Sequence, residues 1–130
     1  MHLKATYCSK SKRASPELLP AYKRYISRRI KFVYDSATGG SNKFAILSGS
    51  FGLINGDHPI PYYDHLLQED EIEPMVKTVT QTLISWGISG ITWYSLPDEL
   101  DPNVWRYRAV ITLASEMAGC RLDTVELLEE

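Results

Sequence analysis

The chain has 130 residues, 44% of them hydrophobic and 23% charged, and a formal net charge of -2. These values are typical of a soluble globular protein, and the length predicts one domain, residues 1–130, with a core of its own. No apolar run approaches the roughly 20 residues that cross a bilayer, and the first residues lack the apolar core of a signal peptide. We therefore expect a cytoplasmic protein without membrane contacts.

Charge is unevenly distributed along the chain. Residues 1–43 contain 10 basic and 2 acidic residues, a net charge of +8, whereas residues 44–130 contain 4 basic and 14 acidic residues, a net charge of -10. Such asymmetry indicates an anionic partner for the first third of the chain. Attraction between the two halves, within the fold or across a dimer, explains it equally well.

The first expected strand is His2–Tyr7, which is short and contains a β-branched and an aromatic residue. The loop that follows combines small hydroxyl side chains with three cations. Ser9, Lys10 and Lys12 would hold a phosphate or carboxylate there, because hydroxyls and amides donate hydrogen bonds and cations supply a favourable field. The loop lacks the glycines of a Walker motif, and an ordinary solvated basic turn is the alternative.

A serine–proline helix start at residues 15–16, interrupted by Pro20, predicts one short turn and then a longer helix. Apolar residues recur at helical spacing along this second segment. Arg24 and Arg28 lie one turn apart, where both would point at the same anion, although a solvated face is the commoner explanation. The β-prone run 32–34 makes a strand the main alternative for this region.

A buried strand is expected at Lys43–Ser48, followed by a long irregular loop rich in glycine, proline and aromatic residues. Loops beyond the carboxyl ends of strands face the crevice of an α/β protein, so this loop is the expected site. Its candidates are Ser48 and Gly49 for ligand binding, Tyr62 for stacking on a base, and Asp57 and Asp64 as acids.

The second half of the chain alternates helix and strand. Its expected elements are a helix over 74–86, a strand within 88–96, a helix over about 103–118 and an edge strand within 120–128. The complete order predicts an α/β fold with three layers, in which helices flank a mostly parallel four-stranded sheet. Cys8, Ser48 and Ser95 would then lie at the carboxyl ends of three strands.

Two motifs carry a family resemblance. The run Leu47-Ser48-Gly49-Ser50-Phe51-Gly52-Leu53, followed by Asp57 and by Ile60-Pro61-Tyr62-Tyr63-Asp64, resembles the YaaA-like superfamily, and the loop Cys8-Ser9-x-x-Lys12 is similar to that family's opening. The resemblance covers about the first half of the chain. YaaA-like proteins are associated with oxidative-stress protection and DNA binding. Related domains occur near enzymes that make or remove modified bases, so the resemblance implies nucleotide or base chemistry. The chain is much shorter than YaaA, shows no helix-hairpin-helix, and has Tyr63 where longer members have an arginine.

Two function classes follow. The first is an enzyme or binding domain for a nucleotide-like phosphorylated ligand, with hydrolysis of an N-glycosidic bond as a reaction that Asp57 or Asp64 would support. Cys8 is a third catalytic candidate if Lys10 and Lys12 stabilise its thiolate, although a small buried cysteine is the commoner case. The second class is a nucleic-acid-binding module without catalysis, and an interaction subunit is a further alternative.

No metal or other cofactor is expected. His58 and His65 have no recognised ligand spacing with the nearby acids, and Cys8 and Cys120 form no Cys-x-x-Cys pair, which indicates reduced thiols. The expected partners are therefore a nucleotide-like small molecule or a nucleic acid.

Overall fold

The computed structural model describes residues 1–130 and contains a five-stranded sheet with the strand order β4-β3-β1-β6-β7. Four strands run parallel: β1 (His2–Tyr7), β3 (Lys43–Ser48), β6 (Gly90–Ser95) and β7 (Arg121–Glu126). The fifth strand, β4 (Gly52–Asn55), pairs antiparallel with β3 at one edge. Strands β1, β3 and β6 are mostly buried, as expected for parallel strands covered on both faces.

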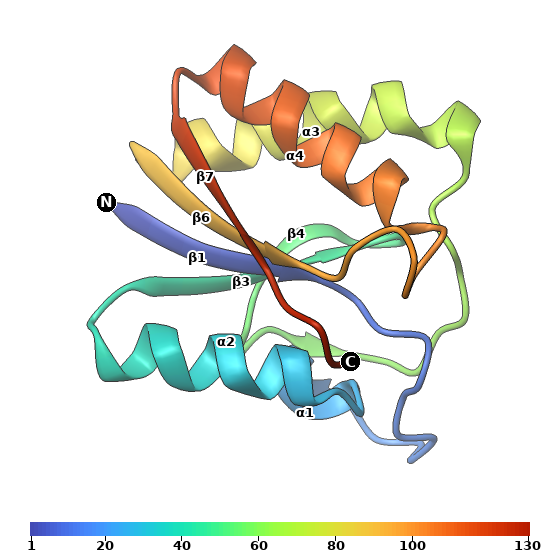
Figure 1. The fold of residues 1–130 in the computed structure, drawn as a ribbon. Coiled ribbons are helices and arrows are strands. Elements are labelled where there is room, and N and C mark those ends of the chain that lie inside the picture. The colour runs from blue at the N-terminus through green and yellow to red at the C-terminus, as the bar shows by residue number, and fades with distance from the viewer.

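Helices cover both faces of this sheet. Helix α2 (Arg28–Gly39) packs on β1 and β3 from one face, and α3 (Ile72–Ser85) and α4 (Val104–Ala118) lie side by side on the other (Figure 1). Leu3, Ile46 and Trp93 are fully buried in the core between these layers. Burial of one large apolar side chain contributes roughly 1.5–3 kcal/mol, so the layers are held together mainly by their apolar faces.

The α/β class is confirmed, but the expected count of four strands is wrong. After Ser48 the chain turns and returns as β4, with Gly52 at a φ of +73°. A glycine tolerates this left-handed conformation without steric cost, and so permits the turn. The segment is short and begins at a glycine, so its sequence alone is typical of a loop, and pairing with β3 makes it a strand.

The helix expected across residues 21–37 is interrupted. Helix α1 (Ala21–Arg24) ends at Tyr25, whose φ of -85° and ψ of 137° are extended, and α2 begins anew after the N-cap Ser27. The Ser27 Oγ accepts the Ile30 N–H at 3.1 Å, which satisfies one of the free donors at a helix start. The break allows Tyr25 to form an isolated β-bridge with Lys12.

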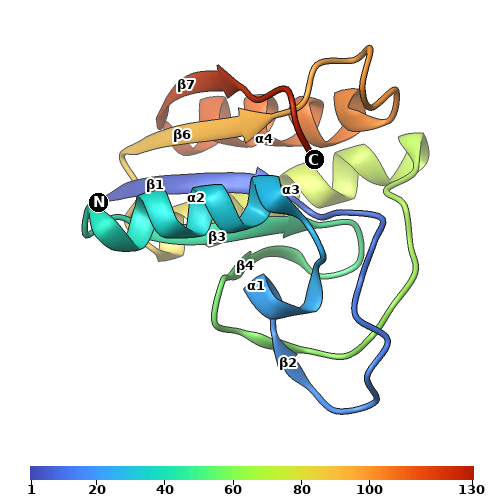
Figure 2. The same ribbon diagram turned by 60° about the horizontal axis from the view of Figure 1, so that its bottom comes forward.

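Irregular segments connect these elements beside the face that α2 covers. Residues 8–18 form a loop without the short helical turn expected at residues 15–16. Strand β2 (Leu19–Pro20) pairs antiparallel with β5 (Pro59–Ile60), which fastens this loop to the segment after β4 (Figure 2). The 3-10 turn η1 (Glu69–Glu71) leads from that segment into α3.

The topology places a crevice between β1 and β6. The chain leaves β1 through α2 and reaches β3 on one side, whereas β6 on the other side is reached through α3 on the opposite face. Ligands of open α/β sheets bind outside the carboxyl ends of the strands at such a topological switch point. Cys8, Ser48 and Ser95 lie at the carboxyl ends of β1, β3 and β6, as expected.

Candidate functional site

A cavity with a volume of about 360 Å³ lies at this switch point and is termed the switch-point cavity below. Its volume falls within the roughly 300–1,000 Å³ of small-molecule sites. The loop after β1, the start of α2, the segment before η1, the residues between β6 and α4, and Glu130 line it. The cavity therefore lies where the fold alone predicts a ligand.

One wall of the cavity is basic and rich in hydroxyl groups. Ser9, Lys10, Ser11 and Lys12 line it, and the Ser9 Oγ donates to the Ser11 carbonyl oxygen at 2.7 Å, which fixes the turn. The Lys12 ammonium lies 4.7 Å from the centre of the Tyr63 ring, within range of a cation–π contact. Neither lysine forms an ion pair with a carboxylate of the protein. Neither positive charge is thus neutralised by a carboxylate of the protein.

The start of α2 contributes a buried arginine. The Arg29 side chain is 1% exposed, and its guanidinium donates to the Thr6 hydroxyl at 2.5 Å and to the carbonyl oxygens of Tyr7 at 2.6 Å and Cys8 at 3.3 Å. It also donates to both carboxylate oxygens of Glu130, at 3.0 and 3.2 Å. Two backbone N–H groups of α2 donate to the Glu130 carbonyl oxygen at 2.7 and 3.1 Å. A carboxylate of the chain itself thus occupies an anion-binding arrangement at the cavity.

Tyrosine hydroxyls line the inner part of the cavity. The Tyr7 Oη donates to the Asp101 Oδ2 at 2.9 Å, and the Tyr107 Oη accepts the Leu67 N–H at 3.1 Å and the Cys8 thiol at 3.5 Å. Burial raises the pKa of Tyr7 and of Tyr107 above the ordinary 10.0, and the Cys8 thiol beside Tyr107 adds to its shift. Both phenols are therefore protonated at neutral pH.

A second hydroxyl cluster lies behind the basic wall. The hydroxyl oxygens of Tyr25 and Tyr63 are 2.5 Å apart, and the Ser48 Oγ donates to the Tyr63 Oη at 2.8 Å. Ser48 also accepts the N–H groups of Ser50 and Phe51, which closes the turn into β4. Burial is the largest cause that raises the pKa of both tyrosines. Ser48 is fully buried, so its hydroxyl stabilises the turn and does not reach the cavity.

Gly49 brings two segments into close contact beside the cavity. A Cβ at this position would lie 2.9 Å from the His65 carbonyl oxygen and 3.0 Å from both the Leu67 nitrogen and the Tyr107 Oη. Only glycine allows this approach. Gly49 therefore positions the segment that carries His65. Gly49 itself does not line the cavity.

Asp64 and His65 also line the cavity. The His65 Nε2 lies 2.8 Å from the Glu71 Oε1, which also accepts the Gln68 N–H at 2.8 Å. These hydrogen bonds, the Gln68 N–H first, lower the pKa of Glu71 below its ordinary 4.5. Asp64 is exposed and forms no ion pair, so its carboxylate is free to accept hydrogen bonds from a ligand.

The structure places Cys8, Ser9, Lys10, Lys12 and Asp64 in the lining of one cavity. Ser9 shapes the loop, and neither lysine pairs with a carboxylate of the protein. Cys8 is 8% exposed, and its thiol donates a hydrogen bond to the Tyr107 Oη. Both features favour a packing role for Cys8 rather than a role as nucleophile.

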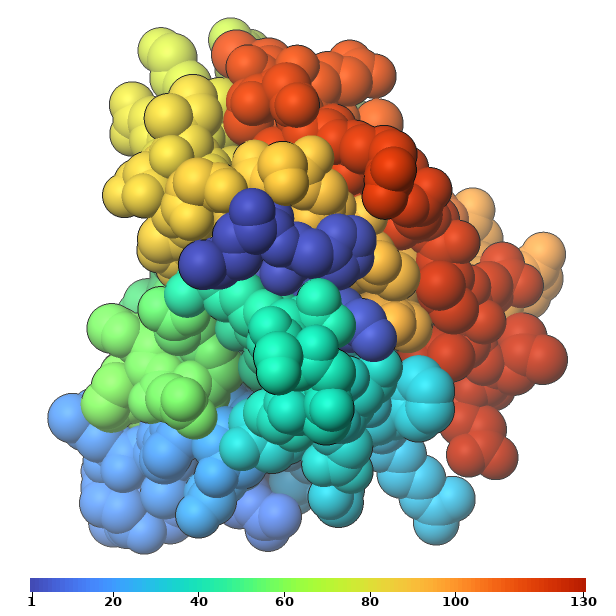
Figure 3. Space-filling view, turned by 90° about the vertical axis from the view of Figure 1, so that its left-hand side faces the viewer, coloured from blue at the N-terminus to red at the C-terminus, as the bar shows by residue number.

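Asp57 and Tyr62 lie outside the cavity. Asp57 is exposed in the turn between β4 and β5, and the N–H of the adjacent Gly56 donates to the Phe44 carbonyl oxygen at 3.2 Å, near the amino end of β3. Figure 3 views this end of the molecule, where the green segment between β4 and β5 lies beside the start of β3. Tyr62 is 50% exposed and does not line the cavity. Asp57 and Ser9 are therefore held at opposite ends of the sheet.

The expected pairing of Arg24 with Arg28 on one anion is not found. Arg24 is fully buried and donates to the carbonyl oxygens of four residues of the surrounding loops at 2.6 to 3.1 Å. Arg28 is exposed, and its guanidinium lies 3.8 Å from the Glu129 carboxylate. The extended backbone at Tyr25 breaks the helix between the two arginines, so helical spacing does not apply to them.

Several residues of the cavity carry no local signal as site residues in the sequence. Arg29 lies among other basic residues, and nothing in the sequence distinguishes it from its neighbours. Tyr107 recurs with the apolar residues of an ordinary amphipathic helix. Asp101 is recognisable only as an expected helix start; in the structure Asn103 is the N-cap of α4, and the Asp101 Oδ1 accepts the Asn103 N–H at 3.0 Å in the turn before the helix. The position of Asp101 after β6 is the one signal that points to the crevice.

No group of three or more His, Cys, Asp or Glu side chains is arranged to hold a metal ion, and no helix is both long and apolar enough to cross a membrane. Comparison of the chain with family models, with curated proteins and with solved structures found no match. Function is therefore inferred from the geometry of the cavity itself.

Proposed function

We propose that the switch-point cavity binds a small phosphorylated ligand of the nucleotide class. The observation that carries this proposal is the loop after β1, whose serines and lysines form one wall of the cavity at the carboxyl ends of β1 and β6. Phosphate oxygens accept hydrogen bonds from hydroxyl and ammonium groups, and each charge-assisted bond contributes about 1.5–3 kcal/mol. Ser11, Lys10 and Lys12 are the expected donors.

Other lining residues suit the remainder of a nucleotide. Asp64 lines the same cavity, where its carboxylate would accept hydrogen bonds from sugar hydroxyls. The rings of Tyr7 and Tyr107, with centroids 5.3 Å apart, also line the cavity and are each 2% exposed. A ligand that carries both a phosphate and free hydroxyls matches these groups.

A hydrolytic version of the proposal assigns the activation of water to Asp64. An N-glycosidic bond is cleaved through an oxocarbenium-like centre that a nearby carboxylate stabilises. Asp64 supports this role because it lines the cavity and is exposed. Asp57 has no part in it, since that side chain lies in the turn between β4 and β5.

The proposal is tested by calorimetric titration with AMP, and with adenosine as the phosphate-free comparison. AMP is expected to saturate one site, and adenosine to bind at least about tenfold more weakly, because it makes no bonds to the basic wall. The double variant Lys10→Ala/Lys12→Ala is expected to weaken AMP binding at least about tenfold. Lys77→Ala, at an exposed position of α3, is the matched control. Equal affinity for AMP and adenosine, or unchanged AMP affinity in the double variant, would contradict the proposal.

Glu130 is expected to compete with an anionic ligand. Its carboxylate occupies the donors of Arg29 and places a negative charge at the cavity. Glu130→Gln should therefore strengthen AMP binding roughly three- to tenfold in the same titration, since a like charge is removed. Glu129→Gln is the control, because Glu129 pairs with the exposed Arg28 and does not line this cavity. Weaker AMP binding in Glu130→Gln would show that the carboxylate supports the ligand site.

A further inference from the structure

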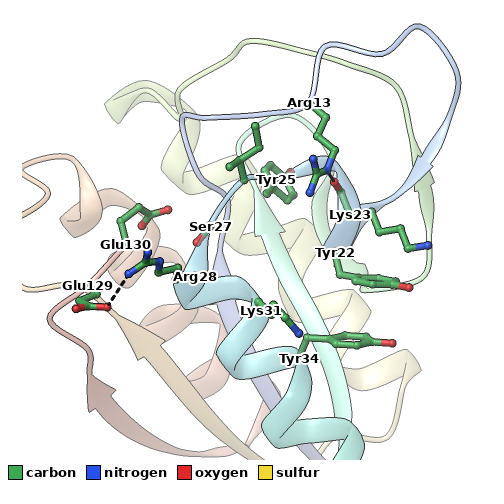
Figure 4. Close-up of a pocket in the computed structure, with 11 residues that line it drawn as sticks. Arg13, Tyr22, Lys23, Tyr25, Ser27, Arg28, Lys31, Tyr34, Glu129 and Glu130 are labelled. Atoms are coloured by element: carbon green, nitrogen blue, oxygen red, sulfur yellow. Dashed lines mark hydrogen bonds and ion pairs between the residues drawn. The ribbon is translucent and has the colours of Figure 1, made fainter.

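A second cavity, of about 670 Å³, lies outside the switch-point cavity and is termed the tyrosine groove. It is an open depression between α1 and the first half of α2, bordered by Arg13 and by Glu129 and Glu130 (Figure 4). None of the residues assigned to the nucleotide ligand above lines it. The groove therefore requires an explanation of its own.

Cations dominate the lining of the groove. Arg13, Lys23, Arg28 and Lys31 face it from three different segments, against the two acids Glu129 and Glu130. The ion pairs within reach are exposed: Lys31 lies 3.0 Å from Asp35, and Arg28 lies 3.8 Å from Glu129. Exposed pairs contribute about 0–1 kcal/mol, so phosphate groups can replace their carboxylates at little cost. The excess of positive charge in residues 1–43 is thus partly gathered in this groove.

An aromatic stack lies among these cations. The rings of Tyr22 and Tyr34 are nearly parallel, with an interplanar angle of 6° and centroids 4.2 Å apart. Phe44 supports Tyr34 from behind in an edge contact at 5.5 Å, and the Lys23 ammonium lies 5.7 Å from the centre of the Tyr22 ring. Both tyrosines are half-buried, and Figure 4 shows their rings projecting to the same side. Such a rigid stack is a platform on which an unpaired base can lie.

We propose that the tyrosine groove binds single-stranded nucleic acid. The four cations contact the phosphate backbone, and the stack of Tyr22 and Tyr34 receives a base. Stacking requires a base that is not paired, and this favours a single strand over a duplex. An acidic peptide would use the cations but would leave the aromatic platform without a planar partner. The groove adjoins the switch-point cavity at Glu130, which lines both.

The binding test uses fluorescence anisotropy of a labelled 12-nucleotide single-stranded DNA of mixed sequence, titrated with the whole protein between 50 and 300 mM NaCl. Four phosphate contacts predict that log K falls against log salt with a slope of about -3, from roughly -0.7 for each contact of a single strand. The double variant Lys23→Gln/Lys31→Gln should reduce this slope by about 1.4. Lys77→Gln removes the same kind of charge from α3 and should leave the slope unchanged.

The stacking part of the proposal is tested separately by Tyr34→Leu, which keeps an apolar side chain against Phe44. It should weaken binding of the single strand roughly five- to a hundredfold with little change in the salt slope. Trp105→Leu replaces an exposed aromatic ring on α4, outside the groove, and should have no effect. Equal affinity for a duplex of the same sequence would overturn the proposal, as would equal binding by Tyr34→Leu and the unmodified protein. Because AMP binding is measured through Lys10 and Lys12, failure of either proposal leaves the other testable.

Discussion

Arg24→Met is expected to destabilise the folded protein by about 3–5 kcal/mol, a large fraction of the roughly 5–15 kcal/mol that stabilises a typical domain. The Arg24 guanidinium is fully buried and donates to the carbonyl oxygens of Arg13, Ser15, Glu17 and Ile60. A buried acceptor that loses its donor costs about 1–3 kcal/mol, and four acceptors lose theirs, while removal of a buried charge returns part of this cost. Urea unfolding measures the change.

Arg28→Met is the matched control for this effect. The same substitution four positions later removes a side chain that is 87% exposed and weakly paired with Glu129, so stability should change by less than about 0.5 kcal/mol. If the free energy of unfolding of Arg24→Met were within about 1 kcal/mol of that of the unmodified protein, water would have to replace the guanidinium as the donor to the four carbonyl groups. The loop of residues 13–17 would then be hydrated in the native state.

Stability is expected to fall steeply above pH 10 because of buried phenols. Burial raises the pKa of Tyr7, Tyr25, Tyr63 and Tyr107 in the folded protein above the ordinary 10.0 of the unfolded chain. A raised pKa gives stability that is fully present below pH 10 and is lost as the pH rises, since the unfolded state releases protons that the folded state retains. Each phenol contributes about 1.4 kcal/mol per pH unit, so four give a slope of about -5.5 kcal/mol per pH unit.

Urea unfolding at a series of pH values from 8 to 12 measures this slope, with tyrosinate absorbance as a second readout. Tyr25→Phe should reduce the slope by about one quarter, whatever its effect on stability at neutral pH. Tyr62→Phe alters an exposed ring and should leave the slope as it is. A protein whose free energy of unfolding stayed constant between pH 10 and 12 would show that water reaches these hydroxyls in the native state.

The elements that the sequence predicted well are those in which one strong pattern governs a whole segment. Helix α3 combines an acidic start, an apolar stripe and Gly87, and it extends over Ile72–Ser85 against an expected 74–86. Strand β3 is an apolar run before a polar turn, and β1 contains a β-branched and an aromatic residue before a polar loop; both have the expected bounds. In such segments local preference and burial favour the same conformation, so the sequence alone is sufficient to predict the helix or strand.

The misplaced elements and residues depend on pairing between backbone segments. Gly52 to Asn55 is a strand because it folds back on β3 as a short hairpin, and the turn that follows carries Asp57 back toward the amino end of the sheet. Its glycine-led sequence is typical of a loop, so it carries no strand pattern of its own. Arg24 and Arg28 share a helix face only if the helix is continuous, and pairing of Tyr25 with the more distant Lys12 interrupts it.

The basic loop after β1 could be predicted to line the crevice, because it follows a strand directly. The other side of the cavity could not, since Asp101, Tyr107 and Glu130 come from segments that topology alone brings to Cys8. Their patterns are those of a helix start, an amphipathic helix and an acidic segment, which are common structural features. A switch point in the strand order identifies the crevice, but only after the order of strands is known.

The attachment of Glu130 to Arg29 determines where further polypeptide would emerge. Any purification tag or reporter joined after Glu130 starts beside the switch-point cavity and the tyrosine groove, both of which Glu130 lines. A polyhistidine or acidic tag at that position would compete with titrated ligands at the entrance of both sites. Fusions are better placed before Met1, at the amino end of β1, because the switch-point cavity lies at the opposite end of that strand (Figure 1).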